Sequence, residues 1–365
     1  MCALSGELVI DLSAIRQNYK IINSNSDVNY ETAVAVKANA YGTGIGKVAP
    51  TLYNAGARSF FVATIDEGIE LRKILADVHI YILNGFSGGA HDACIQYNLV
   101  PVLNSLHEIE LYQNYSVNLE RGLAAILHFD TGMNRLGIPA DEAEVIFDDL
   151  SVLEGIYIQY VISHFSSSEE SNNSVNDEQF QKFQKIINHF PKAKYSICNS
   201  GGVFLSDDYH LDMVRTGIAL YGGNPTDKFT ENPMKAVVSL NVPVLQIKSV
   251  KKGETSGYNG SYRFHKNGRV AIMSIGYADG LLRSVGNGGA LFWKGYKMPI
   301  RGRVSMDLVI CDLSEIPEKN HLRIGDMVEV IGEYQSIDDL ARSAGTISYE
   351  ILTSLGSRYK RIYKD

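Results

Sequence analysis

The sequence TAVAVKANAYGTG, residues 32–44, changes from an apolar run to a loop that contains glycines, and this change indicates the fold. Its first five residues form a continuous apolar run, which predicts a strand buried on both faces. Lys37 follows the run directly, and a loop with two glycines comes next. Seven further apolar runs follow, of which the one containing Pro101 is the weakest strand candidate. The eight predicted strands cover residues 32–36, 60–64, 80–84, 99–103, 124–129, 156–163, 195–198 and 211–214.

Helical patterns, with apolar residues three or four positions apart, separate these runs. They cover residues 66–76, 105–115, 140–150 and 176–190. Eight strands alternating with helices predict an α/β fold, a closed (β/α)8 barrel of the TIM type. In such a barrel the chemistry lies just after the C-terminal ends of the strands. These positions carry Lys37, the segment from His128 to Arg135, His164, Asn199, Ser200 and Arg215.

The pattern changes after about residue 236. Alternating runs separated by glycines and charged turns, such as residues 237–250 and 326–334, predict a β-rich second domain. Two short helices should follow, one capped by Ser336 or Asp338 and one beginning near Tyr349. Because 365 residues exceed the roughly 250–300 at which one core divides, we expect a barrel domain over residues 1–235 and a β-rich C-terminal domain over residues 236–365.

Composition excludes several other classes of protein. A formal net charge of −7 opposes nucleic-acid binding, which needs a basic surface. No apolar run approaches the roughly 20 residues that span a bilayer, and the first ten residues lack the features of a signal peptide. We therefore expect a cytoplasmic protein without a membrane partner. The four cysteines lie far apart and form no C-x-x-C pair, so neither a metal site nor a disulfide framework is predicted.

Lys37 is the strongest candidate for covalent chemistry. A lysine at a strand end is often a solvated rim residue, and alone that interpretation would be favoured. Lysine forms Schiff bases when its amine is partly desolvated and lies beside other cations, because both effects lower its pKa. Arg135 and Arg215, predicted at the same face of the barrel, would supply those charges.

The segment AVAVKANAYGTG resembles the cofactor-lysine motif of the alanine racemases, and further matches follow in the family's order. They are FDTGMNRLG (129–137), SHF (163–165), NSGG (199–202), VRTGIALYGG (214–223), GYADGLLR (276–283), GRVSMDL (302–308) and TISYEILTSLGSR (346–358). The resemblance implies a pyridoxal phosphate barrel plus a β domain, in a homodimer whose partner subunit completes each active site. It implies a racemase that interconverts L- and D-alanine and supplies D-alanine for peptidoglycan.

By the resemblance, Lys37 holds the cofactor as a Schiff base and becomes one of two bases once substrate releases it. Tyr258 is similar to the opposing base, which comes from the other subunit's β domain. Inverting a stereocentre requires proton removal on one face and delivery on the other. A tyrosine acts as a base near neutral pH only if cations or hydrogen bonds favour its phenolate. Without the motif, Tyr258 would be interpreted as a surface residue in a glycine-rich turn.

The other site residues follow from the same resemblance. Arg215 would donate to the pyridine nitrogen and leave it unprotonated, which favours return of the proton over other reactions; a structural salt bridge is the alternative. His164 and Arg215 would form a network with the catalytic tyrosine. The remaining positions divide into a phosphate site at Tyr41, Ser200, Gly217, Ile218 and Tyr349, a carboxylate clamp at Arg135 and Met306, further cofactor contact at Asn199, and an entrance at Tyr277, Arg283 and Asp307.

His128 is the main departure from the family's pattern. Many members carry at this position a lysine, modified to a carbamate, which orients the arginine that corresponds to Arg135. Histidine cannot form that anion. We therefore expect Arg135 to be held by His128, by a bound anion such as chloride, or by neither. As a metal ligand His128 has little support, because no second histidine or cysteine lies at ligand spacing.

Two rival functions stay open at this point. A related barrel-plus-β-domain decarboxylase would release carbon dioxide, but such enzymes favour an acidic partner for the pyridine nitrogen, which opposes Arg215. A non-catalytic pyridoxal phosphate carrier would need only the barrel, and residues 236–365 oppose it.

Overall fold

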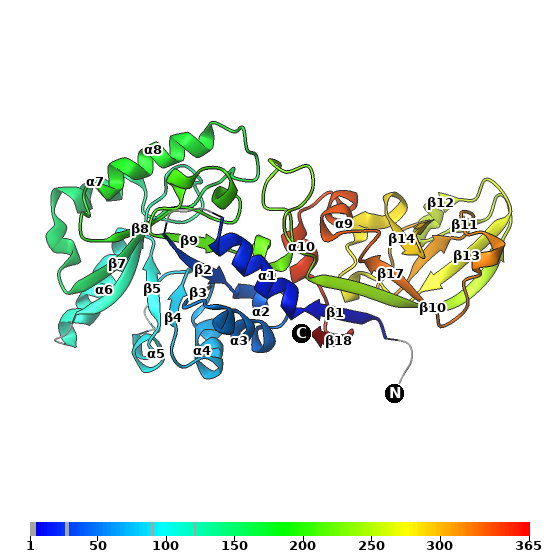
Figure 1. Cartoon of the computed structure of the whole chain (residues 1–365), viewed down its shortest axis with the longest axis horizontal. Coiled ribbons are helices and arrows are strands. Elements are labelled where there is room, and N and C mark those ends of the chain that lie inside the picture. The colour runs from blue at the N-terminus through cyan, green and yellow to red at the C-terminus, as the bar shows by residue number, and fades with distance from the viewer. Residues whose placement is uncertain (1–4, 26–28, 88, 90, 120–121) are drawn as a thin grey trace.

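Eight parallel strands form a nearly closed barrel at one end of the molecule (Figure 1). The structure is a computed structural model that describes residues 5–25, 29–87, 89, 91–119 and 122–365. All eight predicted strands are confirmed within two residues, and the strand containing Pro101 is among them. The strands are β2 (Glu31–Ala35), β3 (Ser59–Val62), β4 (His79–Ile82), β5 (Val100–Leu103), β6 (Leu123–His128), β7 (Ile156–Ile162), β8 (Lys194–Ser196) and β9 (Met213–Thr216).

Backbone hydrogen bonds run from β8 through β7 to β2 and on to β9. At the remaining seam the amide of Arg215 donates to the carbonyl of Cys198 at 2.9 Å, which brings β8 and β9 together. The predicted helices are confirmed around the outside, where Thr64 and Ser105 cap two of them. The barrel helices include α3 (Ile45–Ala55), α4 (Ile65–Ile74), α5 (His91–Gln96), α6 (Leu106–Asn118), α7 (Ala140–Asp148) and α8 (Val175–Ile187).

The second lobe is rich in antiparallel strands, as the alternating pattern predicted. Its main sheet has the order β15-β14-β17-β10-β1-β18, and β13 joins β10 to β16. Beyond it, β11 (Thr255–Ser256) and β12 (Tyr262–Arg263) form a separate hairpin. The strands of the main sheet are β1 (Glu7–Asp11), β10 (Val238–Val250), β13 (Gly268–Met273), β14 (Ala290–Trp293), β15 (Tyr296–Pro299), β16 (Val309–Asp312), β17 (Met327–Ile331) and β18 (Lys360–Lys364).

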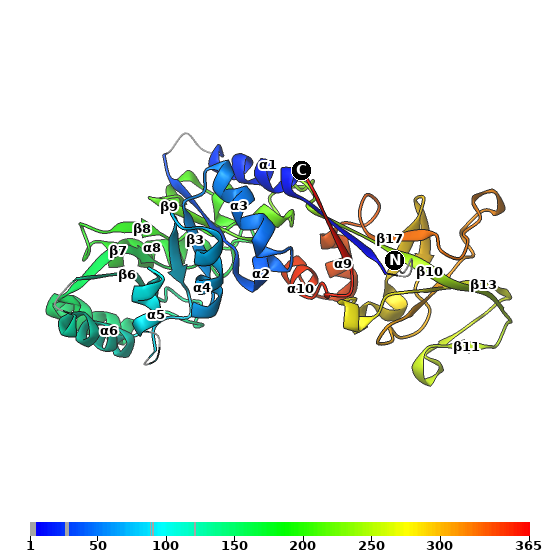
Figure 2. The same ribbon diagram turned by 90° about the horizontal axis from the view of Figure 1, so that it is seen from below.

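The first strand corrects one detail of the expected domains. The division at residue 235 places residues 7–11 with the barrel, but β1 pairs with β10 and β18 in the sheet of the second lobe. Figure 2 shows β1 and β18 lying together, after which α1 (Leu12–Asn23) packs on the barrel. The segments β1–α1 and β18 therefore connect the two lobes.

Two short helices, α9 (Ile337–Ala344) and α10 (Ser348–Thr353), complete the junction of the lobes. Ser336 caps α9, as one of the two predicted alternatives, and accepts a hydrogen bond from the Asp339 amide. Helix α10 packs against α2, where a Cβ atom on Gly42 would lie only 2.2 Å from the carbonyl oxygen of Leu352. This close approach brings Tyr349 to the mouth of the barrel.

The turn after β2 is left-handed. Element α2 (Lys37–Tyr41) has φ values between +52° and +54° at Ala38, Asn39, Ala40 and Tyr41. Each such residue with a Cβ costs about 1–2 kcal/mol. The turn is held by Glu67, which accepts from the Ala38 amide at 2.7 Å, and by Asn39, which accepts from the Ile45 amide at 2.8 Å. Strain and anchoring together fix the direction in which Lys37 leaves the strand.

Ala38→Gly should therefore stabilise the protein. Ala38 is exposed, so its methyl group contributes little packing, whereas glycine adopts positive φ without penalty. After the entropy of the more flexible unfolded chain is subtracted, we expect a gain of about 0.5–1 kcal/mol in the free energy of unfolding, measured by urea denaturation. Ala140→Gly, at an exposed position in right-handed α7, is the control and should lose stability; a loss at both positions would contradict the assigned strain.

Candidate active site

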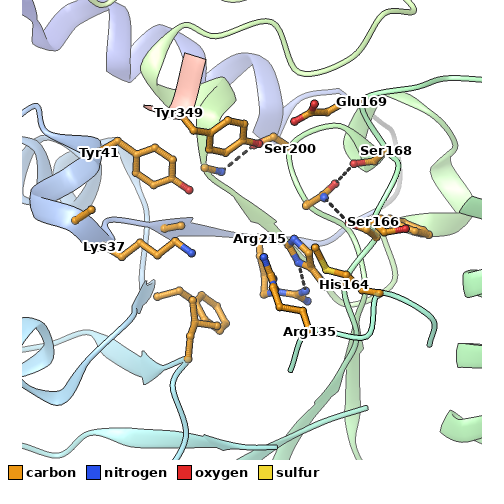
Figure 3. Close-up of a pocket in the computed structure, with 18 of the residues that line it drawn as sticks. Lys37, Tyr41, Arg135, His164, Ser166, Ser168, Glu169, Ser200, Arg215 and Tyr349 are labelled. Atoms are coloured by element: carbon orange, nitrogen blue, oxygen red, sulfur yellow. Dashed lines mark hydrogen bonds between the residues drawn. The ribbon is translucent and has the colours of Figure 1, made fainter. Parts of the chain in front are cut away.

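A cavity of about 450 Å³ opens at the carboxyl ends of the barrel strands. Lys37 and Tyr41 project into it from one side, opposite Arg135, Arg215 and His164 (Figure 3). These side chains come from strand ends or the loops that follow them, as the barrel architecture predicts. Nine predicted site residues line the cavity together: Lys37, Tyr41, Arg135, His164, Asn199, Ser200, Arg215, Gly217 and Tyr349.

The amine of Lys37 lies in a setting that favours its neutral form. Burial lowers the pKa of Lys37, and the nearby charge of Arg135 lowers it further, while Glu67 opposes the shift. A neutral lysine is both a nucleophile toward an aldehyde and a proton acceptor. The environment of Lys37 thus suits it to covalent cofactor binding and to base catalysis.

Most of the N–H groups of Arg215 contact acceptors within the protein. Its side chain lies inside the barrel, and the residue is only 7% exposed. Nη1 donates to the carbonyl and hydroxyl oxygens of Ser196, and Nη2 donates to the Ser163 carbonyl and lies 3.4 Å from Nδ1 of His164. Burial lowers the pKa of Arg215 to about 10, which leaves it charged at neutral pH. Of its five N–H groups, the one on Nε has no acceptor among the described residues.

His164 and His128 are neutral imidazoles beside these cations. Burial lowers the pKa of His164 well below its usual value, and Arg215 and Arg135 lower it further. Burial likewise lowers the pKa of His128 from 6.5 to about 3, with the same two arginines contributing. His128 lies at the end of β6 and also lines the cavity.

These histidines should make the protein acid-sensitive. Below pH 6.5 the unfolded chain binds more protons at both positions than the folded chain does. The free energy of unfolding therefore decreases as the pH is lowered below 6.5, and for His128 this decrease continues to about pH 3. Between pH 8 and pH 5 we expect the free energy of unfolding to fall by about 2 kcal/mol through His128, with a further loss in the same direction through His164. We expect urea denaturation at the two pH values to show that the free energy of unfolding of His128→Asn falls by about 2 kcal/mol less than that of wild type. Equal losses in wild type and variant would contradict the assignment.

Hydroxyl groups and backbone amides gather at the end of the cavity where the phosphate site is predicted. Oγ of Ser200 accepts from the Gly217 amide at 2.8 Å, and the Tyr41 and Tyr349 rings lie nearby (Figure 3). A Cβ on Gly217 would lie 2.3 Å from the Tyr41 hydroxyl, so only glycine permits this approach. Amides at the start of a helical turn bind anions well. The hydroxyls and amides here match the donors that a phosphate needs.

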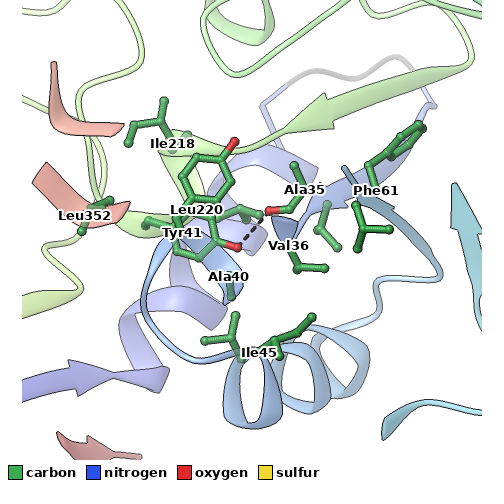
Figure 4. Close-up of a cluster of buried hydrophobic side chains, with 14 of the residues drawn as sticks. Ala35, Val36, Ala40, Tyr41, Ile45, Phe61, Ile218, Leu220 and Leu352 are labelled. Carbon is green, nitrogen blue, oxygen red and sulfur yellow. Dashed lines mark hydrogen bonds between the residues drawn. The ribbon is translucent and has the colours of Figure 1, made fainter. Parts of the chain in front are cut away.

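An apolar cluster supports this end of the site. Tyr41 packs among Ala40, Ile218 and Leu352 (Figure 4). Its ring stacks on Tyr221 at 4.5 Å between centroids. The side chain of Ile218 therefore belongs to the core, and Ile218, unlike Gly217, is not among the residues that line the cavity.

The charges of the cavity fit an anionic cofactor and substrate. Within the described residues neither Arg135 nor Arg215 forms an ion pair, so the alternative of a structural salt bridge for Arg215 finds no partner there. A phosphate, a phenolic oxygen and a carboxylate would supply negative charge to these arginines.

The part of the chain that the structure describes contains no group of three His, Cys, Asp or Glu side chains arranged to hold a metal. Nor does any helix described reach the length and hydrophobicity needed to cross a membrane.

Tyr258 does not line the cavity that contains Lys37. It belongs to η5 (Tyr258–Gly260) of the second lobe and is 64% exposed. Met306 and Tyr277 are also in the second lobe, outside the cavity, with 52% and 42% exposed. Asp307 accepts from Nη1 of Arg358 at 2.7 Å, and Arg283 begins another short helix outside the cavity. Nine of the fifteen predicted site residues thus line one cavity, and these five residues of the second lobe lie outside it.

Several cavity residues escaped sequence reasoning. Ser166, Ser168 and Glu169 continue the loop that begins at His164. Ile347 lies two residues before Tyr349, the motif tyrosine of α10. Asn104 follows β5 and contacts His128, although it does not line the cavity. Its position after a predicted strand was the signal that could have identified it.

Barrel enzymes that attach pyridoxal phosphate to a lysine are the class to which this fold and this cavity correspond. The model of the alanine racemase N-terminal domain matches residues 10–225, and that of the alanine racemase C-terminal domain matches residues 237–363. The chain therefore belongs to the alanine racemase family, which confirms the resemblance in the motifs. It is a pyridoxal-phosphate-dependent isomerase.

Individual relatives agree along the whole chain. An alanine racemase of Brucella abortus is 42% identical, over 99% of this chain and 94% of its own length. A catabolic alanine racemase of Agrobacterium fabrum is 44% identical, over 98% of this chain and 92% of its own length. The crystal structure of alanine racemase from Bartonella henselae, with covalently bound pyridoxal phosphate, matches with a TM-score of 0.94 and 39% identity over 99% of both chains.

Proposed function

We propose that this chain interconverts L- and D-alanine by a two-base mechanism, in a homodimer whose sites each combine two subunits. The observation that carries the proposal is the lysine of lowered pKa that faces two arginines across the cavity. Family membership supports the reaction, and the exposure of Tyr258 supports the shared site.

Pyridoxal phosphate, when bound, supplies an aldehyde for the amino group and a ring that withdraws electrons from the α-carbon. Lys37 would hold it covalently, then accept or donate the α-proton at Nζ on one face. Tyr258 of the second subunit would do the same through its hydroxyl on the other face. The cations of Arg215 and Arg135 would make such a phenolate less costly.

Arg215 would control which reaction follows. Its free Nε–H is available to donate to a ring nitrogen, and its pKa of about 10 keeps the proton on the arginine. By leaving the ring nitrogen unprotonated, Arg215 would weaken the electron withdrawal that the ring supplies, which would favour return of the α-proton over slower reactions. A decarboxylase would be expected to have an acidic residue in this role, so an arginine at position 215 opposes the decarboxylase alternative.

The remaining assignments complete the proposal. Arg135, with the backbone of the second subunit's Met306, would clamp the substrate carboxylate, and Tyr277, Arg283 and Asp307 would shape the entrance from that subunit. Asn199 would act mainly on the loop, because its Oδ1 accepts from Ser168 at 2.6 Å and from the Gly202 amide at 3.1 Å. The phosphate would lie among Tyr41, Ser200, Gly217, Ile218 and Tyr349.

The cellular setting is also proposed. D-alanine for peptidoglycan and a cytoplasmic location fit the family, although relatives described as catabolic exist. The division into residues 1–235 and 236–365 is kept for the barrel and the β-rich part, apart from β1.

Deuterium incorporation tests the reaction. Purified protein with pyridoxal phosphate should convert L-alanine in deuterated water to a racemic mixture, and deuterium should enter the α-position as optical rotation falls. Carbon dioxide release faster than loss of rotation would instead support a decarboxylase. Cofactor binding without either change would support a carrier.

A further inference from the structure

The turn that carries Tyr258 is attached to a neighbouring segment of the second lobe on both of its sides. Before the turn, the Ser256 hydroxyl donates to the Arg301 carbonyl at 2.9 Å. After the turn, the Ser261 hydroxyl accepts from the Arg303 amide at 3.1 Å. The backbone of the neighbouring segment thus holds the turn at both ends.

Two glycines bring this turn and segment 301–303 into direct contact. Gly257, which directly precedes Tyr258, has a φ of +72°, and Gly302 has a φ of +101°. A Cβ atom on Gly257 would lie 2.7 Å from the amide nitrogen of Arg303, and one on Gly302 would lie 3.0 Å from the Cα atom of Gly257. Side chains at these positions would force the two backbones apart. The direction in which Tyr258 leaves the turn therefore depends on where Gly302 lies.

Asn287 joins the two backbones from a third segment, the short helix η7 (Arg283–Gly288). Its Oδ1 accepts from the Gly302 amide at 2.6 Å, and its own backbone amide donates to the Gly302 carbonyl at 3.3 Å. Its Nδ2 donates to the Ser261 carbonyl at 3.3 Å. The side-chain amide has one orientation here, because a reversed amide would place donor against donor and acceptor against acceptor. Asn287 therefore fixes Gly302 and the end of the Tyr258 turn relative to each other.

The position of the Tyr258 hydroxyl depends on this backbone. Most of the side chain contacts solvent rather than its own lobe, and the turn lies between β11 and β12, away from the barrel (Figure 1). A base must come within hydrogen-bond distance of the proton that it accepts. A displacement of about 1 Å can lower a rate by about 10²-fold. A residue that fixes the turn can therefore control proton transfer without touching the substrate.

We propose that Asn287 is a positioning residue for Tyr258, because it joins Gly302 to Ser261 and so holds the turn where the tyrosine hydroxyl reaches the substrate in the other subunit's site. The role of Tyr258 as a base rests on the proposed function, whereas the hydrogen bonds of Asn287 do not. Asn287 thus acts through Tyr258 on one face of the substrate. Proton transfer through Lys37 on the other face does not depend on it.

Exchange of the α-hydrogen of each alanine enantiomer tests the positioning role. Each enantiomer is incubated separately with holoenzyme in deuterated water, and early α-deuterium incorporation is measured by mass spectrometry. Asn287→Ala should slow exchange of the enantiomer that Tyr258→Phe slows by about tenfold, and exchange of the other should stay within about twofold of wild type. Asn287 is exposed, so its truncation leaves the core intact. Ser261→Ala, which removes another attachment of the same turn, should slow the same enantiomer.

Asn267→Ala is the matched control. Asn267 is also an exposed asparagine of the second lobe, and its Oδ1 accepts from the Lys252 amide at 2.8 Å, outside the Tyr258 turn. This variant should slow exchange of neither enantiomer. Equal slowing of both enantiomers by Asn287→Ala, or slowing of neither, would overturn the inference alone. If Tyr258→Phe itself slowed neither enantiomer, the proposed base would fail and this inference would fail with it.

Amide hydrogen exchange tests the attachment of the turn, whether or not the protein racemises alanine. Peptides that cover residues 256–262 of the holoenzyme should exchange faster in Asn287→Ala than in wild type, because the turn opens more readily. The same peptides should exchange at the wild-type rate in Asn267→Ala. Unchanged exchange in Asn287→Ala would show that Asn287 does not hold the turn, and it would overturn the proposal.

Discussion

Lys37→Ala is expected to lower alanine racemisation by about 10⁴-fold or more and to abolish covalent cofactor attachment. The substitution removes both the nucleophile that would hold pyridoxal phosphate and the base on one face of the substrate. The measurements are racemisation rate and mass spectrometry after borohydride reduction. Wild type should carry a cofactor adduct on the peptide that contains Lys37, and the variant should carry none.

Lys73→Ala is the matched control, because Lys73 is exposed on α4 outside the cavity. It should keep both the adduct and the activity. Racemisation by Lys37→Ala within tenfold of wild type, or an adduct on a different lysine, would contradict the assignment of Lys37.

Tyr258→Phe should lower racemisation by roughly 10²–10⁴-fold while the cofactor adduct on Lys37 persists. Only the hydroxyl is lost, so the barrel site stays intact and the proton path on one face is interrupted. Exchange of the α-hydrogen in deuterated water distinguishes the two faces of the substrate. One enantiomer of alanine should still exchange through Lys37, and the other should exchange far more slowly.

Tyr334→Phe provides the comparison, since Tyr334 is another exposed tyrosine of the second lobe and should have no effect. If both enantiomers exchanged at the wild-type rate in Tyr258→Phe, Tyr258 would have no role as a base.

The barrel followed from sequence because each buried parallel strand forms a continuous apolar run, whereas each helix repeats its apolar face every three to four residues. The same strand ends identified Lys37, Arg135 and Arg215, since a closed barrel brings all its carboxyl ends to one face. The roles of Tyr258, Met306 and Tyr349 came only from motif resemblance. Nothing in local pattern marks a tyrosine in a glycine-rich turn as catalytic.

Other features depend on distant contacts and were not predictable from local pattern. The pairing of β1 with β18 joins segments at opposite ends of the sequence. The left-handed turn at Ala38 runs against the preference of alanine and depends on Glu67 from another helix. The contact between Nδ1 of His128 and Oδ1 of Asn104, at 2.8 Å, joins the ends of two different strands.

Mixing two inactive variants tests the shared site most directly. In a mixed dimer of Lys37→Ala and Tyr258→Phe chains, one site has both defects and the other has neither. Random reassociation should therefore restore about a quarter of wild-type activity, because half of the dimers are mixed and each has one intact site. If tagged mixed dimers were isolated and had no more activity than the parent variants, the proposal that two chains build each site would be contradicted.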